Sequence, residues 1–220
     1  MAENINSFFF NTTPRIIYGS NVSEDSNPFS KKIGKSVLLI SDKGITRLKL
    51  YENLITNLRK SGITINIFDD VEADPSLKTL GKAISFGKET NASGIIGFGG
   101  GSSMDVAKLT ALILGSNENL EEAWGVGNAK GPRLPLILVP TTAGTGSEVT
   151  PVSIITVDGD EKRGVSSPLI LPDFAILDPL LTVGLPASAT AATGIDAMVH
   201  AIEAYASKNA NNNPISSLFA

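Results

Sequence analysis

Two periods of hydrophobic and polar residues alternate along this chain. Four short apolar runs lie at residues 36–41, 63–68, 94–98 and 136–139. Between them, apolar residues recur every three or four positions at residues 45–60, 74–87 and 102–114. Short apolar runs bounded by glycine or polar residues predict β-strands, whereas the longer spacing predicts amphipathic helices.

The stretch at residues 45–60 is predicted to be one continuous helix. Its buried face would be formed by Leu48, Tyr51, Leu54, Ile55 and Leu58. Strands that alternate with helices favour parallel pairing. Runs such as LLI and LILV are apolar without alternation, which is typical of strands covered on both faces. The pattern therefore predicts a doubly wound α/β domain with a mainly parallel sheet over about residues 34–140.

The pattern changes twice in the second half of the chain. Residues 141–182 are interrupted by glycine and proline, and predict loops and edge strands. Two short strands are predicted there, at residues 152–157 and 174–177. Pro186 then opens an alanine-rich helix. We expect an α/β domain at residues 1–184 and the start of an all-α domain at residues 185–220, which ends on an apolar half-turn and looks truncated.

Composition and charge narrow the class of protein. The chain has 220 residues, 42% hydrophobic and 18% charged, which is enough for a sizeable core. A net charge of -4 without a basic stripe argues against a nucleic-acid partner. The absence of cysteine excludes a disulfide framework, a cysteine zinc site and a thiol nucleophile.

Targeting and membrane signals are absent from the sequence pattern. The N-terminus carries an acid early and only a run of three phenylalanines, which is unlike a signal peptide. No segment reaches the roughly 18 apolar residues of a membrane span. We therefore expect a soluble, cytoplasmic protein without a membrane partner.

A glycine-rich loop, GFGGGS, occupies residues 97–102 between a predicted strand and a predicted helix. Glycines let the backbone approach an anion, and a helix N-terminus offers free N–H groups and the positive end of a dipole. The spacing differs from the G-x-G-x-x-G fingerprint, and the loop follows the third strand rather than the first. A phosphate cradle and a tight strand-to-helix turn both remain open at this point.

Two other stretches suit a nucleotide. The loop PTTAGTGSEVT at residues 140–150 places small hydroxyls and glycines after the fourth strand, although an ordinary polar loop is the alternative. It contains neither a P-loop nor a nucleophile elbow. Asp42 lies just past the first strand, where an acid commonly accepts from a ribose 2′-OH and repels a 2′-phosphate. The same residue fits an ordinary helix cap equally well.

His200 is the only histidine, and it lies four residues after Asp196 on the alanine-rich helix. Residues at this spacing share a helix face, so a carboxylate and an imidazole can grip one divalent cation. Glu203 lies within a turn. A lone histidine is more often structural, and catalytic metal sites usually have three or more protein ligands. Asp196 and His200 are therefore candidate ligands rather than a complete site.

Three stretches together resemble the iron-containing (group III) alcohol dehydrogenase family. They are GFGGGSSMDVAK at residues 97–108, PTTAGTGSEVT at residues 140–150, and the pattern from AILD at Ala175 to TGIDAMVHAIEAY around Glu203. Their residue types and spacing agree with the family signature, and the resemblance covers essentially the whole chain.

The resemblance implies a dehydroquinate synthase-like α/β domain that binds NAD or NADP, followed by a helical metal-binding domain beyond Gly184. Gly100, Gly101 and Ser102 would hold the pyrophosphate. Asp42 would face the adenosine ribose, which favours NAD. The other positions that match cofactor contacts of the family are Thr141, Thr142, Thr145, Thr150, Val152 and Lys162.

Asp196 and His200 match the first two of the family's four metal ligands. The resemblance therefore implies that they are catalytic residues as well as metal ligands. The other two are histidines further along the family's chain, and this sequence has no other histidine. The metal would usually be Fe²⁺, with Zn²⁺ as the other candidate. The implied reaction is reversible, metal-assisted hydride transfer between NAD and a primary alcohol or aldehyde, or a small diol.

Two alternatives stay open. One is a zinc-dependent relative similar to glycerol dehydrogenase, and the other is a chain that binds NAD without catalysis. We expect the 220-residue chain alone to be inactive, and we expect a homo-oligomer, here taken as a dimer.

Overall fold

The computed structural model describes residues 11–157, 159 and 161–206. Its strands are β1 (Ile16–Tyr18), β2 (Ser36–Ile40), β3 (Thr64–Phe68), β4 (Gly94–Gly99), β5 (Gly125–Val126), β6 (Leu136–Pro140), β7 (Val152–Thr156), β8 (Lys162–Ser166) and β9 (Phe174–Leu177). Its α-helices are α1 (Lys43–Leu48), α2 (Glu52–Lys60), α3 (Leu77–Glu89), α4 (Gly101–Ser116), α5 (Leu120–Ala123) and α6 (Ala187–Ala206).

The strands form two sheets. The larger has six strands in the order β1-β9-β6-β4-β2-β3, and every neighbouring pair in it is parallel. The smaller has three strands in the order β5-β8-β7, with β7 and β8 antiparallel. The parallel α/β architecture predicted from the alternation of strands and helices is therefore confirmed.

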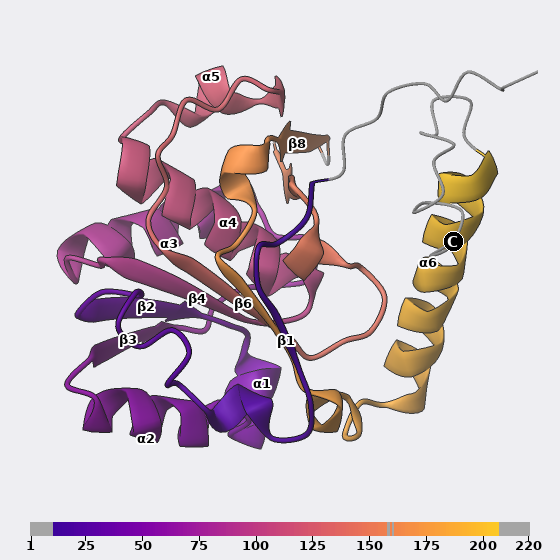
Figure 1. Cartoon of the computed structure of the whole chain (residues 1–220). Helices are drawn as coiled ribbons and strands as arrows, with labels where there is room; N and C mark the ends of the chain where they lie inside the picture. The colour runs from indigo at the N-terminus through magenta and orange to yellow at the C-terminus, as the bar shows by residue number, and fades with distance from the viewer. Residues whose placement is uncertain (1–10, 158, 160, 207–220) are drawn as a thin grey trace, which may run out of the picture.

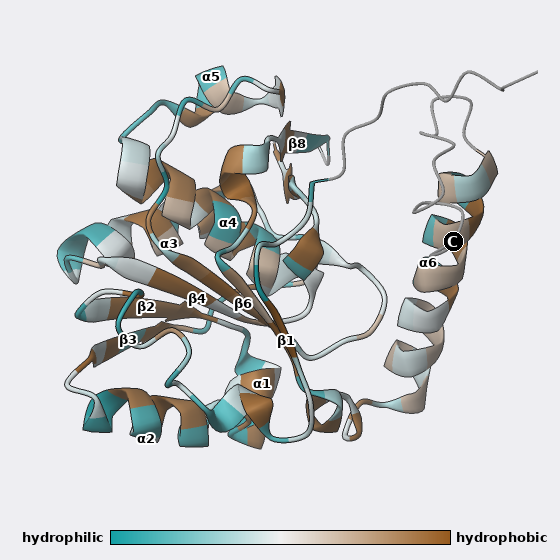
Figure 2. Ribbon diagram, viewed as in Figure 1, coloured by the Kyte–Doolittle hydropathy of each residue, from teal (hydrophilic) through white to brown (hydrophobic). Residues whose placement is uncertain are grey.

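Both faces of the large sheet are covered, as the unbroken apolar runs predict. Successive residues of β2 enter opposite cores: Val37 and Leu39 pack with α1 and α2, while Leu38 and Ile40 pack with α3 and α4. Figure 1 shows these helix pairs on the two faces, and Figure 2 shows the apolar strands between them. Burying each of these aliphatic side chains contributes about 1.5–3 kcal/mol to the free energy of folding. Shifting the register of β2 by one residue would exchange its two faces and lose much of this contribution.

The expected continuous helix at residues 45–60 is wrong, because the chain forms α1 and α2 instead. Lys49 adopts a left-handed conformation with φ of 56°, and its N–H caps the last turn of α1. Of the expected buried face, Tyr51, Leu54, Ile55 and Leu58 are buried, and the Tyr51 hydroxyl donates to Thr46 Oγ1 at 2.8 Å. Leu48, expected to be buried, is 62% exposed.

The expectation of loops and edge strands at residues 141–182 is partly wrong. Strand β9 lies inside the large sheet between β1 and β6, where its buried FAIL sequence packs on both sides. The edge strand next to β9 is β1, whose three residues are too few to show a hydrophobic period. Strand β7 does form, but it pairs with β8, which also escaped prediction because its sequence, KRGVS, has no apolar run.

The order of the strands determines where a ligand can bind. Strand β3 lies on one side of β2 and β4 on the other, and the connecting helices change face at the same point. In doubly wound sheets, ligands bind outside the carboxyl ends of the strands at such a switch. At this edge Gly100 and Thr141 immediately follow β4 and β6, and Asp42 lies two residues past the end of β2.

Helix α6 stands apart from the layers around the sheet (Figure 1). None of its residues is buried, and an apolar stripe that includes Ile195, Met198 and Ile202 is exposed along it (Figure 2). This is the helix expected to begin an all-α domain; the boundary near Gly184 stays a prediction. Among the described residues, no helix is both long enough and apolar enough to cross a membrane.

Candidate cofactor and metal site

Two cavities open at the carboxyl edge of the large sheet, and Gly101 and Ser102 line both of them. The α1-side cavity has a volume of about 600 Å³, and its other lining residues include Asp42, Glu72, Gly100, Ser103, Thr141 and Thr142. The α6-side cavity has a volume of about 640 Å³, and its other lining residues include Asp105, Thr145, Thr150, Val152, Asp196 and His200. Cavities of this size and position are typical of cofactor and substrate sites.

The glycine loop forms the wall between the two cavities. Gly99 has φ of 151°, and a Cβ there would lie 2.8 Å from Ser103 Oγ, so this position requires glycine. Gly100 has no side chain to cap α4, and the first intrahelical bond runs from the Met104 N–H to the Gly100 carbonyl. The amides of the first turn therefore precede that bond and suit an anion such as a phosphate.

Gly100 and Thr142 together form a cradle that a ligand would complete. Gly100 has an ordinary φ of -78°, and a Cβ there would lie 3.6 Å from Thr142 Cγ2, which is normal contact. Thr142 Oγ1 is buried and finds no hydrogen-bond partner among the described residues. A buried hydroxyl without a partner is unfavourable, so a ligand oxygen or nitrogen at this point would stabilise it.

Asp42 caps a helix and also faces the α1-side cavity. Its Oδ1 accepts from the amides of Gly44 and Ile45, at 2.7 and 3.0 Å, at the start of α1. The helix-cap interpretation is thus confirmed, and it leaves Oδ2 on the side of Gly99. Because the capping bonds use only Oδ1, the cap does not exclude a contact between Oδ2 and a ribose, which stays a prediction.

The loop after β3 supplies two carboxylates that sequence reasoning did not single out. Burial tends to raise the pKa of Glu72, but hydrogen bonds from Ser76 and Thr79 outweigh burial and hold its pKa below the usual value. Asp74 has a left-handed φ of 52° and lines the α6-side cavity, where it pairs with Lys162. Lys162, a predicted cofactor contact, therefore reaches the cavity rim only through Asp74.

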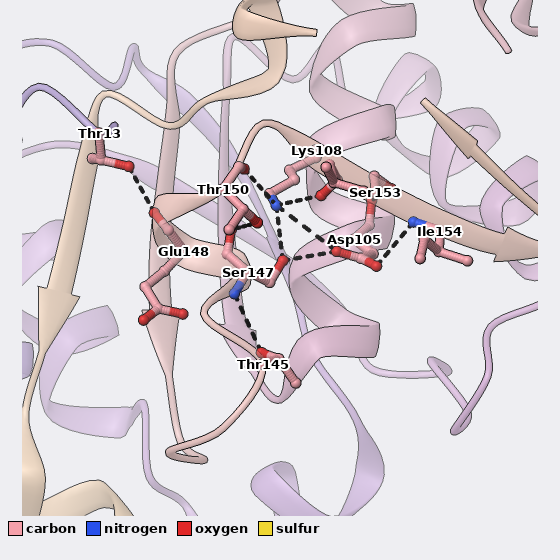
Figure 3. Close-up of polar contacts among 10 residues, drawn as sticks. Thr13, Asp105, Lys108, Thr145, Ser147, Glu148, Thr150, Ser153 and Ile154 are labelled. Atoms are coloured by element: carbon pink, nitrogen blue, oxygen red, sulfur yellow. Dashed lines mark hydrogen bonds and ion pairs between the residues drawn. The ribbon is translucent and has the colours of Figure 1, made fainter. Parts of the chain in front are cut away.

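A buried polar network joins α4 to the loop that follows β6 (Figure 3). Lys108 is fully buried, and its ammonium donates to Ser147 Oγ at 2.8 Å, to the Thr150 carbonyl at 3.0 Å and to the Val152 carbonyl at 2.6 Å. Asp105, one turn earlier, accepts from Ser147 Oγ at 2.7 Å. These bonds hold the loop along the side of the helix that carries the glycine cradle.

Asp105 also reaches strand β7. Its Oδ2 accepts from the Ile154 amide at 3.0 Å, and its own carbonyl accepts from Ser153 Oγ at 2.9 Å. Its Oδ1 lies 3.9 Å from the Lys108 ammonium. One helical turn of α4 therefore fixes both the loop and the first residues of β7, which form much of the α6-side cavity.

Burial governs the charges of this network. It lowers the pKa of Lys108 to about 8, against the opposing effect of the Asp105 and Glu148 carboxylates. It raises the pKa of Asp105, and Lys108 and the donors from Ile154 and Ser147 offset this rise only in part. Glu148 likewise has a raised pKa because it is buried. Neutral and charged forms of these groups are thus closer in energy than in water.

The candidate metal ligands face the α6-side cavity from α6. His200 Nε2 and Asp196 Oδ1 lie 3.7 Å apart, and their side chains are 55% and 43% exposed. Glu203 lines the same cavity, yet no group of three or more His, Asp or Glu side chains in the described ranges is placed to hold one metal ion. The chemistry of Asp196 and His200 suits Fe²⁺ or Zn²⁺, but here they amount to two ligands.

Gly144 is where α6 meets the loop after β6. A Cβ on Gly144 would lie 2.5 Å from the Thr193 carbonyl oxygen, so the two backbones approach as closely as glycine allows. Thr193 is one turn before Asp196. This contact brings the candidate metal ligands to the cavity that Thr145 and Val152 line.

The structure places most of the predicted site residues together. All of them except Lys162 line one of the two cavities. Sequence reasoning missed Asp105, Lys108 and Ser147, although a signal existed. Helix α4 is almost uniformly apolar around Lys108, and a lysine in such a helix with an acid three residues earlier indicates a buried ion pair.

Comparisons with known proteins agree with this geometry. Residues 13–179 match the family model for iron-containing alcohol dehydrogenases. The chain is 40% identical over 188 residues to long-chain-alcohol dehydrogenase 1 of Geobacillus thermodenitrificans, an alignment that covers 84% of this chain and 47% of that protein. It is 35% identical over 212 residues to the NAD-dependent methanol dehydrogenase of Bacillus methanolicus, covering 94% of this chain and 54% of that protein.

A solved structure shows the same arrangement. The iron-containing alcohol dehydrogenase of Thermotoga maritima superposes with a TM-score of 0.88 at 33% identity, covering 97% of this chain and 59% of that one. The chain thus spans about half the length of the curated relatives it matches.

Proposed function

This chain belongs to the iron-containing alcohol dehydrogenase family, and on that basis we propose that it binds NAD for reversible hydride transfer with a small alcohol or aldehyde. A methanol dehydrogenase with 35% identity is named as NAD-dependent, which supports the choice of cofactor. The choice among primary alcohols, aldehydes and small diols is left open.

The observation that carries the proposal is the cradle of Gly100 and Thr142 at the N-terminus of α4. A pyrophosphate on the amides of Gly101 and Ser102 would lie between the two cavities, and Thr142 Oγ1 would gain the partner it lacks among the described residues. The adenosine half would then extend into the α1-side cavity beside Asp42. The nicotinamide half would extend into the α6-side cavity.

The residues of the α6-side cavity have distinct tasks in this proposal. The loop after β6 and the exposed side chains of Val152 and Ile154 would orient the nicotinamide ring and keep water from one of its faces. Asp196 and His200 face the same space from α6 and would supply two ligands to a divalent metal. When bound, NAD accepts or returns the hydride, and the metal polarises the substrate oxygen as a Lewis acid.

A second candidate function is NAD binding without catalysis. The count of metal ligands favours it, because the described residues place two and a catalytic site usually has three or more. The two candidates share the cofactor site and differ only in what happens at α6. The identity of the bound metal distinguishes the third possibility, because a glycerol dehydrogenase-like relative would hold zinc and not iron.

The test uses the protein expressed from its complete reading frame. Bound metal, NADH affinity and alcohol-dependent NADH formation would be measured for the wild type and for His200→Ala. We expect the variant to lose metal and turnover while it keeps its affinity for NADH. Unchanged turnover in His200→Ala would overturn the metal assignment, and failure of the wild type to bind NADH would overturn the proposed function.

A further inference from the structure

We propose that Lys108 is a positioning residue, whose buried ammonium holds the loop at residues 147–152 in the place where the nicotinamide half of the cofactor binds. This inference rests on the proposed function, and it concerns a residue that contacts neither cavity in the structure. Lys108 would act through the loop and not by touching the cofactor.

The geometry of the ammonium supports this role. A lysine has three N–H donors, and those of Lys108 have three acceptors within 3.0 Å, all from the loop or the start of β7. Two of the acceptors are backbone carbonyls, of Thr150 and Val152, so the bonds fix the path of the chain itself. The side chains of these two residues line the α6-side cavity.

A purely structural role would not need a charge at this position. Lys108 lies in an apolar core, and a buried ion pair is commonly no more stabilising than well-packed apolar side chains. An apolar residue of similar length would fill the same space. What it would not supply is three donors that hold the loop to the helix carrying Gly100 and Gly101.

The helix therefore couples the two halves of the proposed cofactor site. Its N-terminus would receive the pyrophosphate, and Lys108, two turns further on, fixes the loop beside the nicotinamide. Without the ammonium, the pyrophosphate cradle would persist while the loop lost its fixed position. Binding energy would then be spent on ordering the loop, and affinity for the complete dinucleotide would fall.

The experiment compares Lys108→Met with Thr110→Val on the same helix. Thr110 is also fully buried, but its hydroxyl has no partner among the described residues, so its loss controls for a change in the helix core. Ser147→Ala serves as a milder variant that keeps both buried charges. Each protein would be titrated with NADH and with ADP-ribose, and amide exchange of residues 147–154 would be followed without ligand.

For Lys108→Met we expect NADH affinity to fall about tenfold or more, while ADP-ribose affinity changes less than about twofold. Exchange at residues 147–154 should rise about tenfold, with α3 and β4 still protected. Ser147→Ala should show the same pattern more weakly, and Thr110→Val should resemble the wild type.

Equal losses of NADH and ADP-ribose binding, or unchanged exchange in the loop, would overturn the proposal. If Lys108→Met does not fold, Ser147→Ala decides by the same criteria. If the wild type binds neither ligand, the proposed function fails, and loop exchange still judges whether Lys108 anchors this segment.

Discussion

The two sides of the α6-side cavity differ in how firmly they are held. On the side of α4, Lys108 is fully buried, the Asp105 side chain is only 17% exposed, and both are bonded to the loop after β6. On the side of α6, no residue is buried, and Asp196 and His200 are about half exposed. The first side is preorganised by the α/β core, whereas α6 contributes no buried residue and approaches the loop after β6 where the Gly144 and Thr193 backbones meet.

This difference separates the two parts of the proposed chemistry. Cofactor recognition needs fixed amides and a fixed loop, and the described residues supply both. Metal binding needs ligands that converge from several directions, and here they come from one helix face. We therefore expect cofactor binding to be a property of the α/β domain itself, and tight metal binding to require ligands beyond Asp196 and His200.

The largest expected effect is on the firmly held side. Gly100→Val would place two methyl groups where the pyrophosphate should approach, and its backbone angles accept a β-branched residue. NADH affinity should fall about 100-fold or more, which calorimetry would measure.

Gly81→Ala is the matched control, because a Cβ at Gly81 meets nothing within 4 Å on an exposed part of α3. That variant should bind NADH like the wild type and be slightly more stable. Normal NADH binding by Gly100→Val would show that the glycine loop is only a turn.

A smaller effect concerns the charge inside the preorganised side. The pKa of Lys108 is lowered by burial from 10.5 to about 8, so above pH 8 the unfolded chain binds more protons than the folded one. Stability therefore rises with pH in this window, by about 2 kcal/mol between pH 8 and 10. Urea unfolding between pH 8 and 10 would measure this rise in the free energy of unfolding. Lys108→Met is the reference, because the other titrating groups are present in both proteins and their effect cancels in the difference. A difference that is flat or falls with pH would contradict the assignment.

The smallest expected effect is at the adenosine end. Asp42→Asn keeps an oxygen to cap α1 but removes the negative charge that would face a 2′-phosphate. The preference for NADH over NADPH should fall about tenfold, with the melting temperature nearly unchanged. Wild-type protein that binds both cofactors equally would remove Asp42 from the cofactor site.

Local sequence patterns predict the elements whose structure is determined by residues close together in the sequence. The strands β2, β3, β4 and β6 are buried on both faces, so their unbroken apolar runs are visible without a structure. The glycine loop is visible for a related reason, since only glycine fits Gly99. Strand β1 was missed because it has only three residues and pairs with β9, far away in the sequence, and β8 was missed because KRGVS has no apolar run.

The same distinction explains the site. Gly100 and Thr142 belong to sequence motifs, and the structure brings them together. The role of Lys108 was not predicted because its acceptors lie 39 to 44 residues away, in a loop whose path no local pattern determines. The break at Lys49 was missed because apolar spacing continues through it, while the packing of Tyr51 decides where α2 begins.

The most direct test of the difference between the two sides is a pair of titrations on the 220-residue chain, one with NADH and one with Fe²⁺ or Zn²⁺. We predict one NADH per chain with a dissociation constant below about 100 μM, and metal binding weaker than that and reversed by chelator. His200→Ala should leave the NADH titration unchanged. Stoichiometric, chelator-resistant metal together with absent NADH binding would contradict the account.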